Sequence, residues 1–161
     1  IDKYFFKESK KKVIGLRFFN VYGNYEHHKK DMCSPVYKFT NQLKDNGHLN
    51  LFDFRKKKEP RRDFIHVNDA IKMILFLKTK KKNGLYNIGT GKPRSFVNVA
   101  EILIKKLGYG KINYIKFPNV LKNKYQHYTN ANISKIIKLG YKNEIKDLEK
   151  GISSYLKFFK S

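Results

Sequence analysis

The chain has 161 residues, a formal net charge of +23 at pH 7 and one cysteine, Cys33. Its length suffices for one domain that buries ~70% of its unfolded surface, and no apolar run approaches the ~20 residues of a membrane span. A single cysteine excludes an intramolecular disulfide and indicates a reducing, cytoplasmic setting.

The positive charge comes mostly from lysine, with 31 Lys against 5 Arg, beside 15 Asn and 15 Ile. A surface selected for nucleic acid favours arginine, which bonds phosphates and base edges in bidentate fashion. Residues with A/T-rich codons are abundant throughout, which indicates compositional drift. We therefore expect solvated lysine faces and no specific nucleic-acid partner.

The N-terminal region is predicted to hold a helix end, Asp2–Ser9, whose missing start leads us to expect a further segment in front of Ile1. Val13–Gly23 then has the pattern of a buried parallel strand, because β-branched and aromatic residues precede a polar end. Asn20 at that end is positioned to hydrogen-bond a ligand, and Gly23 allows a sharp turn.

The next region begins with a polar, irregular segment, Asn24–Ser34. Pro35 suits the first turn of a helix that ends at Asp45–Gly47. A short strand, Leu49–Phe52, and a basic loop, Arg55–Arg62, follow. The apolar face of the helix is predicted from helical spacing and comprises Val36, Phe39, Thr40 and Leu43.

Two strand–helix pairs come next. Asp63–Val67 is predicted as a strand, and Asn68 or Asp69 as the cap of the helix after it. Leu85–Ile88 is predicted as a compact buried strand, and a loop leads from it to a helix capped by Ser95. The predicted apolar faces are Ile71, Ile74, Leu75 and Leu77 on the first helix, and Val99, Ile102, Leu103 and Leu107 on the second.

The last third of the chain is predicted to contain a strand, Lys111–Phe117, an extended segment, Pro118–Tyr128, and a short helix near Ile133–Leu139. A final helix has apolar residues at helical spacing, namely Leu148, Ile152, Tyr155, Leu156 and Phe159. The alternation of strands and helices predicts an α/β protein.

Several motifs are better explained by structure than by chemistry. Gly89–Lys92 is similar to a phosphate loop, but Thr90 stands where a Walker loop needs lysine and Arg94 where a dinucleotide fingerprint needs glycine. His27–His28 has no accompanying carboxylate or thiol cluster, so no metal site is predicted. His66, on an apolar strand beside a helix cap, is expected to be structural.

Three motifs follow one another along the chain: Leu-Arg-Phe-Phe-Asn-Val-Tyr-Gly at 16–23, Arg-Asp-Phe-Ile-His-Val-Asn-Asp at 62–69 and Tyr-Asn-Ile-Gly-Thr-Gly at 86–91. In this order and spacing they resemble the extended short-chain dehydrogenase/reductases that act on nucleotide sugars. Further signatures narrow the resemblance to the ADP-glyceromanno-heptose 6-epimerases of lipopolysaccharide core synthesis: His28-Lys29, Phe117-Pro118, Leu121-Lys122 and Tyr125-Gln126.

The resemblance implies the C-terminal part of a doubly wound Rossmann-type sheet plus a small α/β substrate-binding domain. Residues 1–23 and 63–95 would be the remaining Rossmann-type elements, and residues 24–62 and 96–161 the substrate-binding domain. The family's N-terminal half, with its Gly-rich NADP loop and Tyr-x-x-x-Lys pair, would be absent. We therefore expect the fragment to be inactive alone, and the complete protein to be a homo-oligomer such as a pentamer.

The resemblance also implies a reaction and a site. The heptose of an ADP-sugar would be oxidised with NADP to a ketone and reduced again from the opposite face, which inverts C6. Lys29 would be one acid/base group and, with Val21, would contact NADP. The residues implied to bind the ADP-sugar are Asn20, Asp31, Lys38, Phe52, Asp53, Phe54, Arg55, Arg62 and Tyr125.

Asn20, Lys29, Arg62 and Tyr125 are expected to converge on one sugar-diphosphate cleft. The diphosphate suits Arg62, since a guanidinium is permanently charged and bidentate. A lysine base must lose its proton near neutral pH, and burial beside the positive charges of His28 and Lys30 would favour this.

The sequence also departs from the family pattern. Asp31 stands where a serine is expected and Lys38 where a histidine is expected, and the loop Arg55–Arg62 is longer than usual. An acidic Asp31 beside a diphosphate is unfavourable unless a lysine pairs with it. The alternatives left open are another epimerase or dehydratase of the same superfamily, and a non-catalytic basic binding module or gene remnant.

Overall fold

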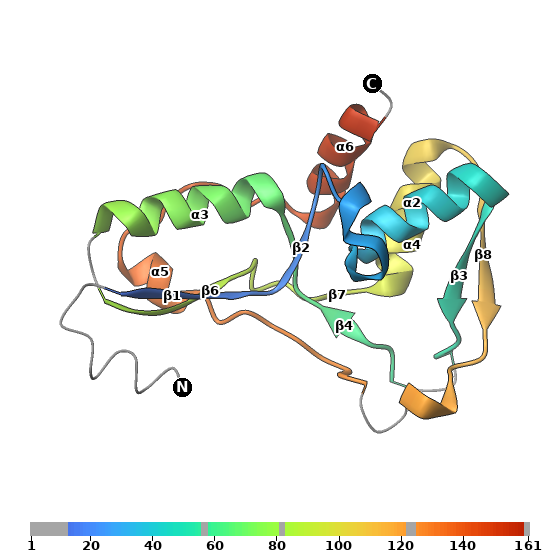
Figure 1. Ribbon diagram of the computed structural model, residues 1–161, viewed down its shortest axis with the longest axis horizontal. Helices are drawn as coiled ribbons and strands as arrows, with labels where there is room; N and C mark the ends of the chain where they lie inside the picture. Colours follow the sequence, from blue (N-terminus) through green and yellow to red (C-terminus); the bar gives the residue numbers. More distant parts are fainter. Residues whose placement is uncertain (1–12, 56–57, 81–82, 122–124, 160–161) are drawn as a thin grey trace.

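The computed structural model describes residues 13–55, 58–80, 83–121 and 125–159. The predicted helix end at Asp2–Ser9 lies outside these residues. Two parallel strand pairs and their helices form the two ends of an elongated molecule, and α6 (Leu148–Phe159) lies between them (Figure 1).

The predicted strand Val13–Gly23 is observed as two strands, β1 (Ile14–Phe18) and β2 (Asn20–Tyr22). β1 runs parallel to β6 (Gly84–Ile88), whereas β2 runs parallel to β5 (Phe64–His66). The switch occurs at Phe19, whose amide donates to the carbonyl of Ile88 over 3.0 Å and whose carbonyl accepts from the amide of Val21 over 2.8 Å. The parallel direction is confirmed, but the run is not continuous.

The burial expected for this stretch is only partly observed. Phe18 is 54% exposed, and Arg17 before it is exposed as well. Among the described residues, β1 pairs with β6 along one edge only, so the end of β1 lacks the neighbours that would bury it.

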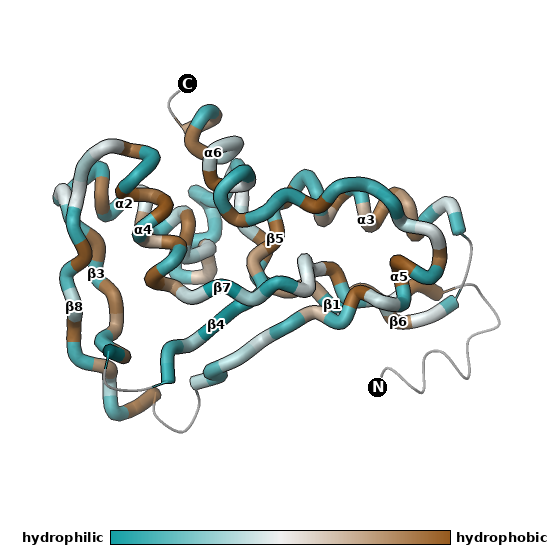
Figure 2. Tube along the Cα trace, turned by 180° about the vertical axis from the view of Figure 1, so that it is seen from behind, coloured by the Kyte–Doolittle hydropathy of each residue, from teal (hydrophilic) through white to brown (hydrophobic). Residues whose placement is uncertain are grey.

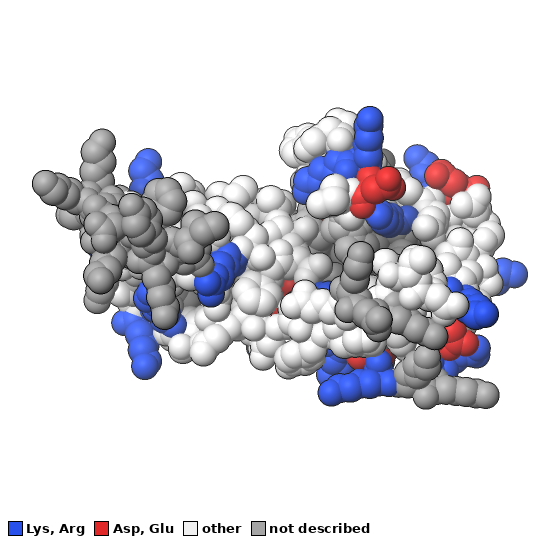
Figure 3. All heavy atoms as spheres, turned by 60° about the horizontal axis from the view of Figure 1, so that its bottom comes forward, with Lys and Arg blue, Asp and Glu red and all other residues white. Residues whose placement is uncertain are grey.

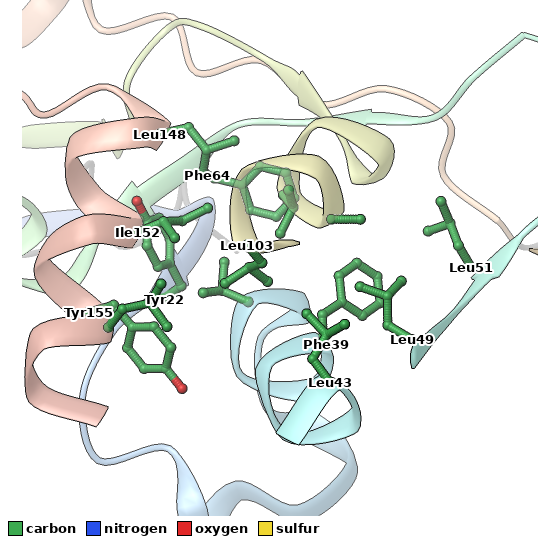
Figure 4. Packing of buried hydrophobic residues seen from close by; sticks show 14 residues of the cluster. Tyr22, Phe39, Leu43, Leu49, Leu51, Phe64, Leu103, Leu148, Ile152 and Tyr155 are labelled. Carbon is green, nitrogen blue, oxygen red and sulfur yellow. The ribbon is translucent and has the colours of Figure 1, made fainter. Parts of the chain in front are cut away.

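At the other end, β3 (His48–Phe52) pairs in parallel with β8 (Lys111–Ile115) against α2 (Pro35–Asn46). The helix α2 starts at Ser34, whose hydroxyl accepts from the amide of Tyr37, and ends at Gly47, which has a φ of 67°. The predicted buried face of α2 is confirmed, as Figure 4 shows for two of its residues, and consists of Val36, Phe39, Thr40 and Leu43.

The predicted face of α3 (Val67–Lys80) was partly wrong, since Ile71 and Leu75 are exposed. The buried residues are instead Asp69, Ala70, Met73 and Leu77. Asp69 turns inward because its carboxylate accepts from the backbone amide of Lys146 over 2.9 Å and lies 3.2 Å from the ammonium of the same residue. These contacts with Lys146 account for the place of Asp69 on the buried face of the helix.

The remaining elements follow the predicted order. β4 (Arg61–Arg62) and β7 (Arg94–Ser95) form an antiparallel pair, and β7 leads into α4 (Phe96–Leu107). Ser95 caps α4 as predicted, in a capping box with Asn98. The predicted segments near 118–139 contain η2 (Asn119–Leu121) and α5 (Ser134–Lys138), and the segment 24–34 contains η1 (His27–Met32).

Two hydrophobic clusters meet at β5. Phe64 belongs to the cluster formed with α2, β3, α4 and α6, whereas Ile65 belongs to the cluster formed with β1, β6, α3 and α5. Neighbouring residues of a strand point to opposite faces, so one short strand serves both clusters. Figure 2 shows apolar stretches in the elements at both ends of the molecule. The proposed domain boundaries stay a prediction.

The carboxylate of Asp63, which is fully buried, connects three segments that are distant in sequence. It accepts from the amide and hydroxyl of Thr90, both over 2.7 Å, from the amide of Gly91 over 2.8 Å and from the amide of Ala131 over 2.9 Å. The backbone carbonyl of Asp63 accepts from the backbone amide of Asn20 over 2.9 Å. Asp63 thereby fixes the loop after β6 and the segment before α5 against β2.

The Asp63→Asn variant is expected to lower the free energy of unfolding by about 3 kcal/mol or more, because an amide replaces one accepting oxygen and leaves buried amides unpaired. Urea unfolding followed by circular dichroism measures this change. Asp45→Asn, at an exposed position of α2, is the matched control and should stay within about 0.5 kcal/mol of the wild type. Equal stabilities of the two variants would contradict the role given to Asp63.

Candidate functional site

A cavity of about 760 Å³ opens between α2, β3, β8, α4 and the loop that follows β3. Its walls are mostly apolar, with a few polar and charged side chains, which is typical of a site for a small organic ligand. The lining residues are Pro35, Lys38, Phe39, Gln42, Asn50, Leu51, Phe52, Phe54, Arg55, Glu59, Pro60, Phe96, Val97, Tyr114, Ile115 and Tyr125.

One aromatic wall of this cavity is formed by Phe52, Phe54 and Tyr125, which pack with Phe117 and His127 outside the lining. The rings of Phe54 and Tyr125 are stacked with centroids 6.1 Å apart, and Phe117 lies edge-on to Tyr125 at 5.0 Å. Phe52 contacts Phe117 at 5.2 Å, and His127 contacts Tyr125 at 5.5 Å. A group of rings at the side of a cavity provides a flat apolar surface for a planar ligand.

Arg62 lies at the edge of the aromatic wall and is only 8% exposed. Its guanidinium carbon is 5.4 Å from the ring centroid of Tyr125 and 5.8 Å from that of Phe96. The guanidinium donates to the backbone carbonyls of Arg61 and Gln126. Within the described part of the chain, Asp and Glu side chains form no ion pair with it.

Burial lowers the pKa of the Arg62 guanidinium, although the group remains protonated at neutral pH. Burial raises the pKa of the Tyr125 phenol, against the opposing effect of Arg62. The result is a buried cation that has no carboxylate counter-ion among the described residues and lies beside a neutral aromatic wall. An anionic ligand is the natural partner for such a group.

The structure brings together part of the predicted substrate site. Lys38, Phe52, Phe54, Arg55 and Tyr125 line the cavity, and Arg62 contacts Tyr125. Asp53 is adjacent, where it forms a bidentate pair with Arg55 over 3.0 and 2.7 Å. The residues outside the lining are Asn20, Val21, Lys29 and Asp31, so the expected convergence of Asn20 and Lys29 with Arg62 and Tyr125 is not observed at this cavity.

Lys29 lies in η1 and has an anionic neighbour. Its ammonium is 3.5 Å from the carboxylate of Glu26, a residue that is only 2% exposed. Glu26 also accepts from the amide of Gly23 over 3.1 Å, and from the amide and hydroxyl of Ser34, both over 2.7 Å. Glu26 therefore closes both ends of the segment that carries Lys29, and sequence reasoning missed it.

The two residues that depart from the family pattern contact each other. The ammonium of Lys38 donates to the backbone carbonyl of Asp31 over 2.7 Å. Because this bond is made to the main chain, it does not neutralise the charge of the Asp31 side chain.

Sequence reasoning also missed cavity residues outside the quoted motifs. Phe96 begins α4 directly after its cap, and Tyr114 stacks under the guanidinium of Arg55 at 4.4 Å. Glu59 and Gln42 complete the polar part of the lining. The alternation of β8 predicts that Tyr114 faces one side of the strand, but not that this side lines a cavity.

The glycine-rich loop Gly89–Gly91 is a turn, as expected. Its amides at Thr90 and Gly91 donate to Asp63, so they are not available to a phosphate. A Cβ at Gly89 would collide with the side chain of Ala131, which explains the glycine there.

In the described ranges, His, Cys, Asp and Glu side chains form no group of three or more that could hold a metal ion. None of the helices described is long and apolar enough to cross a bilayer. Lys and Arg side chains occupy separate areas on the face drawn in Figure 3.

His66 is a core residue, 2% exposed, with its ring at right angles to Tyr22 at 5.5 Å. Its Nδ1 accepts from the amide of Asn68 over 3.2 Å. Burial, with the positive charge of Lys146, lowers the pKa of the imidazole, although Asp69 opposes this. The folded chain therefore takes up the His66 proton at a lower pH than the unfolded chain does.

This difference predicts a pH-dependent stability. In the unfolded chain, the His66 imidazole takes up its proton near its ordinary pKa of about 6.5. The free energy of unfolding therefore falls as the pH falls through this value. His66→Asn keeps an acceptor for Asn68 but does not titrate, and its urea unfolding should show a smaller loss between about pH 7.5 and 5. His28→Gln, at an exposed position, should keep the wild-type loss. An unchanged pH dependence in His66→Asn would refute the assignment.

The fold and the site together define an α/β protein with parallel strand pairs and an apolar cavity beside a buried arginine. Residues 3–89 match the NAD dependent epimerase/dehydratase family. The chain belongs to this family.

Similar proteins were found by sequence. An ADP-L-glycero-D-manno-heptose-6-epimerase of Alkalilimnicola ehrlichii is 42% identical over 148 residues, which cover 89% of this chain and 46% of the relative. A protein of the same name from Fusobacterium nucleatum is 36% identical, and the match covers 49% of that relative. The chain spans about half the length of the curated relatives it matches.

Similar proteins were also found among solved structures. An ADP-L-glycero-D-manno-heptose-6-epimerase of Helicobacter pylori superposes with a TM-score of 0.85 at 32% identity, over 99% of this chain and 48% of that one. A UDP-glucose 4-epimerase of Thermotoga maritima superposes with a TM-score of 0.82 at 24% identity, over 98% and 49%, and supports the fold alone. The chain thus contains part of a Rossmann-type fold, as predicted.

Proposed function

We propose that this chain is the substrate-binding part of an ADP-glyceromanno-heptose 6-epimerase and binds the ADP-sugar in the cavity between α2, β3, β8 and α4. The names of the similar proteins support the substrate class. The single observation that carries the proposal is Arg62, a buried guanidinium with no carboxylate counter-ion in the described ranges, next to an aromatic cavity.

In this proposal Arg62 holds the diphosphate. A diphosphate offers several acceptor oxygens to the planar fork of a guanidinium, and partial burial strengthens such charge-assisted bonds. The ligand would supply the negative charge that no Asp or Glu of the described ranges provides beside Arg62. Asn20, Asp31, Lys38 and Asp53 are proposed as further substrate contacts, as the family resemblance implies.

The aromatic wall accommodates the nucleoside. Phe54 and Tyr125 line the cavity, as do Arg55 and Tyr114, whose guanidinium and ring are stacked. The volume of about 760 Å³ falls in the range of about 300–1,000 Å³ that is usual for small-molecule sites. Arg55 is already neutralised by Asp53, which leaves Arg62 as the stronger candidate for the diphosphate.

The described residues do not form a complete NADP site. The amides of Thr90 and Gly91 are engaged by Asp63, and the 161 residues contain no Gly-rich dinucleotide fingerprint. The family name supports a nicotinamide dinucleotide, and NADP in particular is part of the proposal. We therefore assign substrate binding to this chain and no turnover by the chain alone.

Lys29 is proposed as an acid/base group and, with Val21, as a contact of the cofactor. Glu26 keeps its ammonium in place by the 3.5 Å ion pair, and the ends of the segment are fixed by the bonds of Glu26 to Gly23 and Ser34. A residue in this position acts on the reacting carbon and not on the ADP moiety.

Binding of ADP tests the role of Arg62. We expect Arg62→Lys to weaken ADP binding by about tenfold or more in isothermal titration calorimetry, because a point charge replaces a bidentate donor. Arg61→Lys is the matched control, since Arg61 is the exposed neighbour on the same strand, and its affinity should stay within about twofold of the wild type. A wild-type chain that does not bind ADP would refute the proposed function.

The separation of binding from chemistry is tested at Lys29. Because Lys29 lies outside the cavity lining, Lys29→Ala should leave the Kd for ADP unchanged within about twofold. Circular dichroism melting serves as the control for folding. Loss of ADP binding in a folded Lys29→Ala chain would show that Lys29 belongs to the nucleotide site and would refute its separate role.

A further inference from the structure

Glu59 lines the cavity, and the proposed function gives its carboxylate no role. The residue is half-buried, and its Oε1 is buried without a hydrogen-bond partner among the described residues. A buried acceptor that lacks a partner costs free energy, so the free chain carries a penalty that a bound donor would remove.

The cations that line the same cavity contact other groups in the described part of the chain. Arg55 forms a bidentate pair with Asp53, and its guanidinium lies over the ring of Tyr114. The ammonium of Lys38 donates to the carbonyl of Asp31. The partner of Glu59 is therefore expected to come from the ligand.

The position of Glu59 in the chain indicates which part of a nucleotide this donor belongs to. Glu59 and Arg62 are three residues apart, so their Cα atoms are separated by at most ~11 Å. If Arg62 holds the diphosphate, the ligand donors nearest to it are the hydroxyls of the adjoining ribose. The amino group of the base lies at the far end of the nucleoside, toward the aromatic wall.

We propose that Glu59 is a specificity-determining residue whose carboxylate accepts a hydrogen bond from a ribose hydroxyl of the bound nucleotide. The inference rests on the proposed function, because it uses Arg62 as the diphosphate site. Carboxylates bind ribose hydroxyls in the same way in dinucleotide-binding folds. The carboxylate also disfavours ligands that bring phosphate to this position, since like charges repel.

The experiment compares ADP with 2′,3′-dideoxy-ADP, which lacks both hydroxyls, by titration calorimetry of the 161-residue chain. We expect the wild type to prefer ADP by about tenfold or more, the usual effect of one hydrogen bond to a charged group. Glu59→Ala should abolish this preference through a loss of ADP affinity. Glu101→Ala, an exposed glutamate of α4 outside the lining, should keep it.

The outcomes separate this inference from the proposed function. Failure of ADP to bind the wild type would refute both. Binding of ADP with an undiminished preference in Glu59→Ala would refute only the role of Glu59. The second probe is inosine diphosphate, which lacks the amino group of adenine. If the wild type prefers ADP to inosine diphosphate and Glu59→Ala loses this preference, the carboxylate faces the base. In that case the ribose assignment is wrong.

A variant that conserves the shape of the side chain covers the case in which Glu59→Ala does not fold. Glu59→Gln keeps one accepting oxygen but no charge, and neutral hydrogen bonds are weaker, so the preference for ADP should fall by about threefold or more. Circular dichroism melting identifies the folded variants. An unchanged preference in folded Glu59→Gln and Glu59→Ala contradicts the inference.

Discussion

The carboxylate of Asp63 is the interaction on which the arrangement of this chain depends. It occupies the point where β2, the loop after β6 and the segment before α5 approach one another, and it satisfies backbone amides from two of them. Arg62, the residue before it, is positioned by the same short stretch of backbone. The buried anion that organises the fold and the buried cation assigned to the ligand are thus neighbours that serve different partners.

The sequence predicts well those elements whose pattern is set locally. Ser34, Gly47 and Ser95 delimit helices through their own side chains or backbone freedom, and the buried face of α2 follows from spacing alone. The face of α3 is different, because Asp69 turns inward to meet Lys146, 77 positions away. A local sequence pattern cannot indicate a partner that is so far away in the sequence. An aspartate in the first turn of a helix is therefore easily interpreted as a solvated cap.

The same limit applies to the site. Motif residues such as Phe54, Arg62 and Tyr125 lie at or beside the cavity, and the family resemblance could point to them. Phe96, Tyr114 and Glu59 complete the walls only because α4, β8 and the loop after β3 pack together. Glu26 is missed for another reason: a charged residue in a polar segment gives no sign that backbone amides from both ends will bury it.

The opposite orientation of Phe64 and Ile65 on β5 has a consequence for how this chain can vary in length. An insertion or deletion of one residue between Arg62 and Ile65 would exchange the two side chains and place each in the wrong cluster. A change in length is better tolerated where the backbone is not yet tied to either cluster, as in the stretch before Arg61. Glu59 and Pro60 lie there and line the cavity, so the cavity can vary in shape while the frame behind it stays constant.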